Sequence, residues 1–199
     1  MAAATHETQH PTSTGIDSRK VLMWIFLASE CLFFGSLIST YLIFKGDSIS
    51  GPTPAEILNI PVTSASTFVL LMSSLTMVLA VYGAQHGRLG MMKAMLLATI
   101  VLGLGFLGFQ AYEFASFVHE GLGLTTNQFG TTFFVLTGFH GTHVFVGVLY
   151  LLSLLLAANR RTGLGRERAL HVDIAGLYWH FVDIVWIVIF TIVYLIPNN

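Results

Sequence analysis

Charged side chains are scarce in this sequence of 199 residues. Lys, Arg, Asp and Glu make up 10% of it, whereas soluble domains carry about a quarter. The formal net charge is −1, so there is no basic excess that would draw the chain to a nucleic acid. The single cysteine, Cys31, excludes an internal disulfide and says nothing about the compartment. These shortages argue against a water-soluble domain and against a nucleic-acid-binding protein.

The sequence contains several long runs of hydrophobic residues. Hydrophobic residues make up 54% of the chain, and a helix that crosses a bilayer needs about 20 of them in succession. Five segments meet that length, at residues 21–44, 62–84, 91–117, 129–158 and 174–196. The sequence therefore predicts an all-α membrane protein, a bundle of five transmembrane helices.

Polar and helix-breaking residues separate the five segments. A Gly-Pro-Thr-Pro run at 51–54 marks an exposed loop, and Pro61 suits the first turn of the second helix. The first residues are polar and fit neither a signal peptide nor an Arg-rich transit peptide. We expect residues 1–19 to be a disordered polar tail and residues 20–199 to form one transmembrane domain.

Lysine and arginine are distributed unevenly between the two ends of the predicted helices. One end and its loops hold eight of them: Arg19, Lys20, Arg88, Lys93, Arg160, Arg161, Arg166 and Arg168. The other end holds only Lys45. Because these residues favour cytoplasmic loops, the pattern predicts a cytoplasmic N-terminus and a periplasmic C-terminus.

Six Asp, Glu and His side chains fall inside the predicted spans, where ionisable groups are costly and usually have a partner or a task. They are Glu30, Glu113, His140, His143, His180 and Asp183. A helical rise of about 1.5 Å per residue predicts two polar layers. One layer holds Glu30, His180 and Asp183 near the middle of the membrane, and the other holds Glu113, His140 and His143 further out.

The two layers predict specific partners. We expect His180 to be the nearest partner of Glu30, because both helices enter from the same side. Glu30 should be a neutral acid, since no lysine or arginine lies at its depth and an isolated charge in hydrocarbon costs several kcal/mol. We expect Glu113 to hydrogen-bond His140 or His143, directly or through water, because they share a depth on two helices that a short loop joins.

Several chemistries remain open for these groups. A transition-metal site could use His140, His143 and a carboxylate, and a haem could take one histidine from each of two helices. The carboxylates could serve a proton or ion pathway. The plainest interpretation is that each histidine hydrogen-bonds a neighbouring helix and stabilises the bundle.

A run of glycines in the third span matches the dinucleotide-binding fingerprint by letter only. Gly103, Gly105 and Gly108 lie inside an apolar span, whereas that fingerprint needs a strand before it and a helix start after it. We interpret them, together with the glycines at 138, 141 and 147, as small residues that allow close helix approach.

Four segments together resemble subunit III of the haem-copper respiratory oxidases. They read WIFLASECLFFG at 24–35, QAYEF at 110–114, GFHGTHV at 138–144 and YWHFVDIVW at 178–186. The first resembles that family's helix with a buried glutamate, the second its Gln/Glu motif and the third its paired-histidine helix. The fourth resembles its last helix, and the likeness runs from about residue 21 to residue 196.

The resemblance implies a subunit with no cofactor of its own, the haems and copper lying in partner subunits. It implies packing against subunit I in a complex with subunit II and a small subunit IV, with bound phospholipid. It further implies roles in dioxygen access and sustained proton uptake, and it singles out Glu30 as the buried carboxyl near the lipid or dioxygen route. Glu113, His140, His143, His180 and Asp183 would be the supporting polar network.

The chain departs from the longer members of that family, which have two helices before the glutamate helix. Five-helix members are typical of bacterial oxidases, so the resemblance implies a bacterial inner-membrane protein in which other subunits replace those two helices. The alternatives are the accessory membrane subunit of a nitric oxide reductase, a small carrier or channel, and a stand-alone metalloenzyme.

Overall fold

Five membrane-spanning helices make up the computed structural model of the chain, which describes residues 15–45, 60–159 and 165–196. They are α1 (Ser18–Phe44), α3 (Ile60–Gln85), α4 (Leu89–His119), α5 (Gln128–Asn159) and α6 (Gly165–Phe190). A short π-helix, η1 (Thr191–Leu195), continues α6 to the end of its span. Each helix is long and apolar enough to cross a bilayer, which confirms the predicted fold class.

Local chemistry accounts for several helix ends. The carboxylate of Asp17 caps α1 by accepting a hydrogen bond of 2.9 Å from the backbone N–H of Arg19. Pro61 occupies the first turn of α3, where its missing N–H has no intrahelical partner to lose. Gly87 and Gly121 have φ values of 68° and 90°, a left-handed conformation that glycine adopts without steric cost. These glycines let the chain turn after α3 and after α4.

Two boundaries differ from the sequence prediction. The last helix begins at Gly165, nine residues before the start predicted from hydropathy at residue 174, because a helix can extend into the polar interface after its apolar stretch has ended. Likewise Ser18 and Arg19 belong to the first turn of α1 rather than to a tail. The rest of the predicted tail, up to residue 14, lies outside the described residues.

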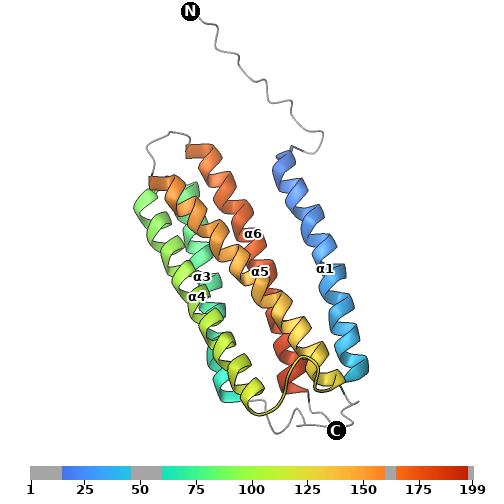
Figure 1. Cartoon of the computed structure of the whole chain (residues 1–199). Coiled ribbons are helices and arrows are strands. Elements are labelled where there is room, and N and C mark those ends of the chain that lie inside the picture. Colours follow the sequence, from blue (N-terminus) through green and yellow to red (C-terminus); the bar gives the residue numbers. More distant parts are fainter. Residues whose placement is uncertain (1–14, 46–59, 160–164, 197–199) are drawn as a thin grey trace, which may run out of the picture.

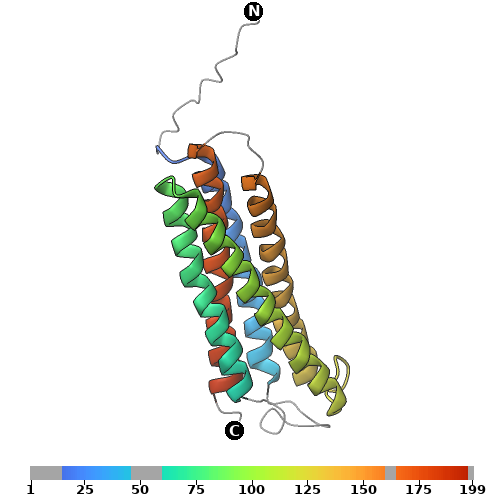
Figure 2. The same cartoon turned by 90° about the vertical axis from the view of Figure 1, so that its left-hand side faces the viewer.

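Four of the helices close a ring, and the fifth packs on its outside. In the ring α3 contacts α4, α4 contacts α5, α5 contacts α6 and α6 returns to α3. Helix α1 contacts only α5 and α6 to any extent, and Figure 1 shows it at the side of the bundle. Both views show the helices running along one common axis (Figures 1 and 2).

The buried share of each helix reflects its place inside or outside the ring. In a continuous apolar stretch of 18 residues from each span, 56% of the residues are buried in α6 and η1 but only 11% in α1. The buried residues of α1 are Leu27, Phe34 and Tyr41, spaced by seven residues, so they form one stripe that faces α5 and α6. Most of α1 is therefore a lipid-facing or partner-facing surface.

Two tryptophans of α6 fill the centre of the ring and bind α3 by hydrogen bonds. Trp179 Nε1 donates to Ser73 Oγ at 2.9 Å, and Trp186 Nε1 donates to Thr67 Oγ1 at 3.0 Å. Both indoles are almost completely buried. A buried indole N–H needs an acceptor, so the small hydroxyl residues of α3 fix how α6 sits against it.

Candidate functional site

Glu30 and His143 form a pair at mid-membrane between α1 and α5. Glu30 lies 12 residues after Ser18 in α1, and His143 lies 15 residues after Gln128 in α5, so each is near the middle of its helix. His143 Nε2 is 3.2 Å from Glu30 Oε2, with side-chain exposures of 18% and 16%. The distance is that of an ion pair, although the alignment falls short of hydrogen-bond geometry.

The other ring nitrogen of His143 fixes which edge of the imidazole faces Glu30. His143 Nδ1 lies 2.7 Å from the carbonyl oxygen of Phe139. A carbonyl can only accept, so Nδ1 carries the hydrogen and donates it. Nε2 is then the nitrogen that faces the Glu30 carboxyl, 3.2 Å from Oε2. Each side chain thus has a polar neighbour at a depth where an isolated ionisable group is costly.

His143 of this pair lines an apolar groove between α1 and α5. The groove has a volume of about 440 Å³ and is lined by Met23, Phe26, Phe139, Thr142, His143, Val146, Tyr150 and Tyr178. The Tyr178 hydroxyl, from α6, donates a 2.9 Å hydrogen bond to the backbone carbonyl of His143. On the other side of the imidazole the ring of Phe34 stands edge-on, with centroids 5.0 Å apart. His143 is therefore held by three helices while one side of it faces the groove.

The predicted pairing of Glu30 with His180 is wrong. His180 Nδ1 lies 2.6 Å from the hydroxyl oxygen of Ser74 on α3, whereas Glu30 is paired with His143. Asp183, which the sequence predicts in the same layer, is 97% buried inside the four-helix ring, and neither of its carboxyl oxygens has a hydrogen-bond partner among the described residues. His143 is at the same height in the bundle as Glu30 and His180, so depth alone could not choose between the two histidines.

The predicted direct hydrogen bond from Glu113 to His140 or His143 is also wrong. Glu113 Oε1 accepts a short hydrogen bond from the hydroxyl of Thr63 on α3. Glu113 lies nine residues beyond the middle of α4, which places it about 13 Å along the helix axis from that middle. His143 lies near the middle of α5, so the two side chains are at different depths. His140 is fully buried and stacks on Trp186 with ring centroids 4.9 Å apart. Neither of its ring nitrogens has a hydrogen-bond partner among the described residues.

The six ionisable residues therefore do not form one network. In the described residues, only Glu30 and His143 of the six form an ion pair with each other. Two hydroxyl residues of α3 that the sequence did not single out are partners of two more: Thr63 bonds Glu113 and Ser74 contacts His180. The same helix also buries Ser66, Thr67 and Ser73. The sequence pattern that could have identified these residues is serine and threonine three or four positions apart in an apolar span. Such hydroxyl residues bind side chains on neighbouring helices.

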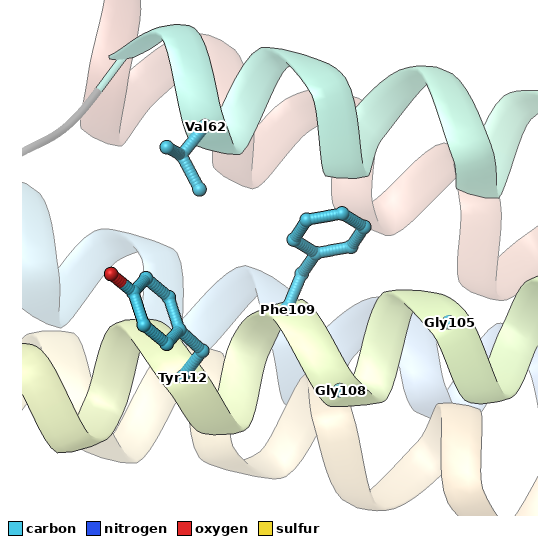
Figure 3. Close-up of a pocket in the computed structure, with 5 residues that line it drawn as sticks. All are labelled: Val62, Gly105, Gly108, Phe109 and Tyr112. Carbon is cyan, nitrogen blue, oxygen red and sulfur yellow. The ribbon is translucent and has the colours of Figure 1, made fainter.

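Metal-binding geometry is absent from the part of the chain that the structure describes. No three side chains of His, Cys, Asp or Glu come close enough together there to hold an ion. A second pocket, between α3 and α4, has a volume of about 480 Å³ and is shown in Figure 3. Its lining is Val62, Gly105, Gly108, Phe109 and Tyr112, which offers no carboxylate, imidazole or thiol.

Comparison with known proteins gives one consistent family. The family model for "Cytochrome c oxidase subunit III" matches residues 1–197. The chain is 43% identical over 172 residues to cytochrome c oxidase subunit 3 of Bacillus sp. (strain PS3), covering 86% of this chain and 83% of the relative. It is 40% identical over 172 residues to quinol oxidase subunit 3 of Bacillus subtilis, covering 86% and 84%. A probable quinol oxidase subunit 3 of Staphylococcus saprophyticus is 40% identical over 178 residues, with 89% and 88% covered.

Proposed function

Because the chain belongs to the cytochrome c oxidase subunit III family, we propose that it supports the catalytic subunit I of a terminal oxidase without carrying a redox centre itself. Its relatives are subunit III of cytochrome c and quinol oxidases, so the chain is a haem-copper oxidase subunit. With five membrane-spanning helices it is a multi-pass protein of the bacterial inner membrane. The named relatives favour an oxidase over the nitric oxide reductase alternative.

The observation that carries the finer proposal is the Glu30–His143 pair beside the groove. The pair joins α1 to α5 at mid-membrane, and its His143 lies in the mainly apolar wall of the groove. An apolar groove that reaches mid-membrane suits a phospholipid acyl chain or dioxygen, both of which partition into hydrocarbon. The proposed role is therefore to hold lipid, to admit dioxygen and to sustain proton uptake by the complex over many turnovers.

The exposed surface of α1 supports the proposed partners. Helix α1 buries only a narrow stripe against α5 and α6, and its remaining faces are free for lipid or for other subunits. We propose contacts with subunit I directly, with subunit II and a small subunit IV in the same complex, and with bound phospholipid. A neighbouring subunit then supplies the wall that two further helices form in longer family members.

Substitutions of Glu30 in the assembled oxidase test the proposal. Glu30→Gln keeps the side-chain volume and leaves an amide that can still donate to or accept from His143. We expect the complex to assemble, with an electron-transfer rate near that of the unsubstituted enzyme. Glu30→Ala removes the partner of His143 and leaves a cavity, so a larger change is expected. In both variants the defect should be a lower apparent oxygen affinity or faster inactivation during turnover.

The measurement is oxidase rate against oxygen tension and against turnover number. Glu120→Gln is the matched control, because Glu120 is an exposed carboxylate at the end of α4. An immediate and complete loss of activity in an assembled Glu30→Gln complex would show that Glu30 acts in the chemistry itself. If both Glu30 variants gave the same oxygen dependence and the same inactivation rate as the control, the pair would have no part in oxygen or proton supply.

A further inference from the structure

Tyr178 of α6 contacts both helices that carry the Glu30–His143 pair. Its hydroxyl donates the 2.9 Å hydrogen bond to the backbone carbonyl of His143 on α5. Its ring stacks on Phe26 of α1, with centroids 6.4 Å apart and ring planes inclined by 24°. Tyr178 is 94% buried, and it lines the groove together with Phe26 and His143. One side chain of α6 thus joins α1 and α5 beside the groove.

A glycine of α5 makes the bond to His143 possible. A Cβ atom at Gly147 would lie 3.1 Å from Cε1 of Tyr178, whereas carbon atoms pack best at about 3.5–4.0 Å. Because that atom is missing, the phenol can lie close to the α5 backbone and reach the carbonyl four residues earlier. In an α-helix this carbonyl also accepts from the N–H of residue 147, and a carbonyl oxygen has two lone pairs. Tyr178 therefore bonds the backbone of α5 without breaking the helix.

The contact with Phe26 supports the other member of the pair. Phe26 lies four residues before Glu30 in α1, so the two side chains project from the same face of that helix. Only 11% of the apolar stretch of α1 is buried, so each contact that it makes matters for its placement. Tyr178 therefore holds α1 one turn away from Glu30, and it holds α5 at His143 itself.

The pair depends on such support because its own contact is not a well-aligned bond. His143 Nε2 is 3.2 Å from Glu30 Oε2, but that oxygen has no hydrogen-bond partner among the described residues. A directional bond would hold the two groups together by itself, and interactions of this kind weaken steeply when they are misaligned. The distance between Glu30 and His143 is therefore set by the placement of their helices.

We propose that Tyr178 is a positioning residue for the Glu30–His143 pair. Its hydroxyl sets the height of His143 against α6, and its ring supports the part of α1 that brings Glu30 to His143. The inference rests on the proposed function, in which the pair and the groove serve oxygen and proton supply. Tyr178 acts there through the pair and not on oxygen or protons directly.

An oxygen titration of variants in the assembled oxidase tests this role. Tyr178→Phe removes the hydroxyl and keeps the ring, so we expect assembly and a maximal rate near that of the unsubstituted enzyme. Displacement of His143 should raise the apparent KM for oxygen severalfold. Ser73→Ala is the matched control, because it removes the hydrogen-bond acceptor of the neighbouring Trp179 on α3, a helix that carries neither member of the pair. Its apparent KM for oxygen should be unchanged.

A thermal double-mutant cycle gives a second measurement, which does not depend on oxygen. Tyr178→Phe should lower the thermal midpoint of the complex by about 2–4 °C, and Glu30→Ala should lower it as well. Neither substitution removes an atom that the other residue bonds. If Tyr178 positions the pair, the midpoint of the double variant falls by less than the sum of the two single decreases. Ser73→Ala combined with Glu30→Ala should be additive.

The outcomes separate this inference from the proposed function. If Glu30→Ala raises the apparent KM for oxygen and Tyr178→Phe does not, the positioning role is overturned and the proposed function stands. A raised KM in Tyr178→Phe alone overturns it too, because Tyr178 would then act without the pair. If neither variant changes the oxygen dependence or the inactivation rate, the proposed function fails and the thermal cycle decides the positioning role. Additivity of Tyr178→Phe with Glu30→Ala overturns that role in every case.

Discussion

At the scale of single residues, the contact between Glu30 and His143 is the central feature. An ion at this depth must recover the cost of leaving water, which is several kcal/mol. A polar partner at 3.2 Å offsets part of that cost, so each side chain of the pair stabilises the other at mid-membrane. The carbonyl of Phe139 accepts from Nδ1 and so fixes Nε2 as the nitrogen that faces the carboxyl.

A double-mutant cycle at this pair gives the first residue-scale prediction. Glu30→Gln and His143→Gln each alter one side of this contact, so each should lower the thermal midpoint of the complex. The midpoint of the double variant should fall by less than the sum of the two single decreases. Once one side chain of the contact is replaced, replacing the other removes less stabilisation. We expect a coupling of about 0.5–3 kcal/mol, the range found for residues in contact.

The control for the cycle is Glu30→Gln combined with Ser74→Ala. Ser74 contacts His180 and not the pair, so its effect should add to that of Glu30→Gln. Full additivity of Glu30→Gln with His143→Gln would mean that the two side chains do not interact in the complex.

At the scale of elements, the position of α6 depends on two glycines that leave room for Trp179. A Cβ atom at Gly103 of α4 would lie 2.7 Å from the Trp179 ring, and one at Gly147 of α5 would lie 2.9 Å from it. The indole is thus held between two helix backbones while its N–H binds Ser73. This is the close approach expected for these two glycines, and it sets the distance of α6 from α4 and α5.

Alanine at either glycine should destabilise the ring. The added methyl group overlaps a rigid, fully buried ring that cannot move away, and overpacking of this kind costs about 1–3 kcal/mol. Gly103→Ala and Gly147→Ala should therefore lower the thermal midpoint and the yield of assembled complex. Gly108→Ala is the matched control, because a Cβ there has no neighbour within 4 Å and alanine favours the helix. Equal effects at all three positions would refute this account of how Trp179 is held.

At the scale of the whole molecule, the uneven charge of the two ends predicts orientation. In the described part of the chain, α1, α4 and α6 begin at the end of the bundle that carries Arg19, Lys20, Arg88, Lys93 and Arg168. The opposite end carries Lys45 alone among lysines and arginines. Since positively charged loops stay in the cytoplasm, the N-terminus should be cytoplasmic and the C-terminus periplasmic.

Reporter fusions measure this orientation directly. Alkaline phosphatase fused after Asn199 should be active, because it folds only in the periplasm, and a fluorescent protein that folds only in the cytoplasm should be dark there. The same two reporters fused within the turn at Gly87 serve as the control and should give the reverse result. A fluorescent C-terminal fusion with inactive phosphatase would show the opposite orientation.

The lack of a redox centre is a second prediction for the whole molecule. Its basis is that no complete set of metal ligands comes together in the described residues. Subunit III separated from the complex in mild detergent should show no Soret band and no stoichiometric copper, iron or zinc by elemental analysis. The remaining complex should retain its haem and copper, and it serves as the control. A haem that stays with the separated subunit would contradict the prediction.

The sequence by itself determined the number and order of the spans and the family to which the chain belongs. Both are local properties: a run of apolar residues long enough to cross the bilayer is helical wherever it packs, and four short motifs carry the family likeness. Helix ends were less predictable. The first turns of α6 are polar, and apolar length cannot show where a helix starts within the interface.

Only the tertiary structure decided which polar groups meet. Depth along an axis follows from residue number, but the rotation of each helix about its axis and the choice of neighbour depend on packing of the whole ring. Glu30, His143 and His180 lie at the same height, and α1 packs so that Glu30 meets α5. His180 is turned to Ser74 on α3 instead. The partner of Glu30 was therefore decided by the fit of five helices, in which the stripe of Leu27, Phe34 and Tyr41 sets the rotation of α1.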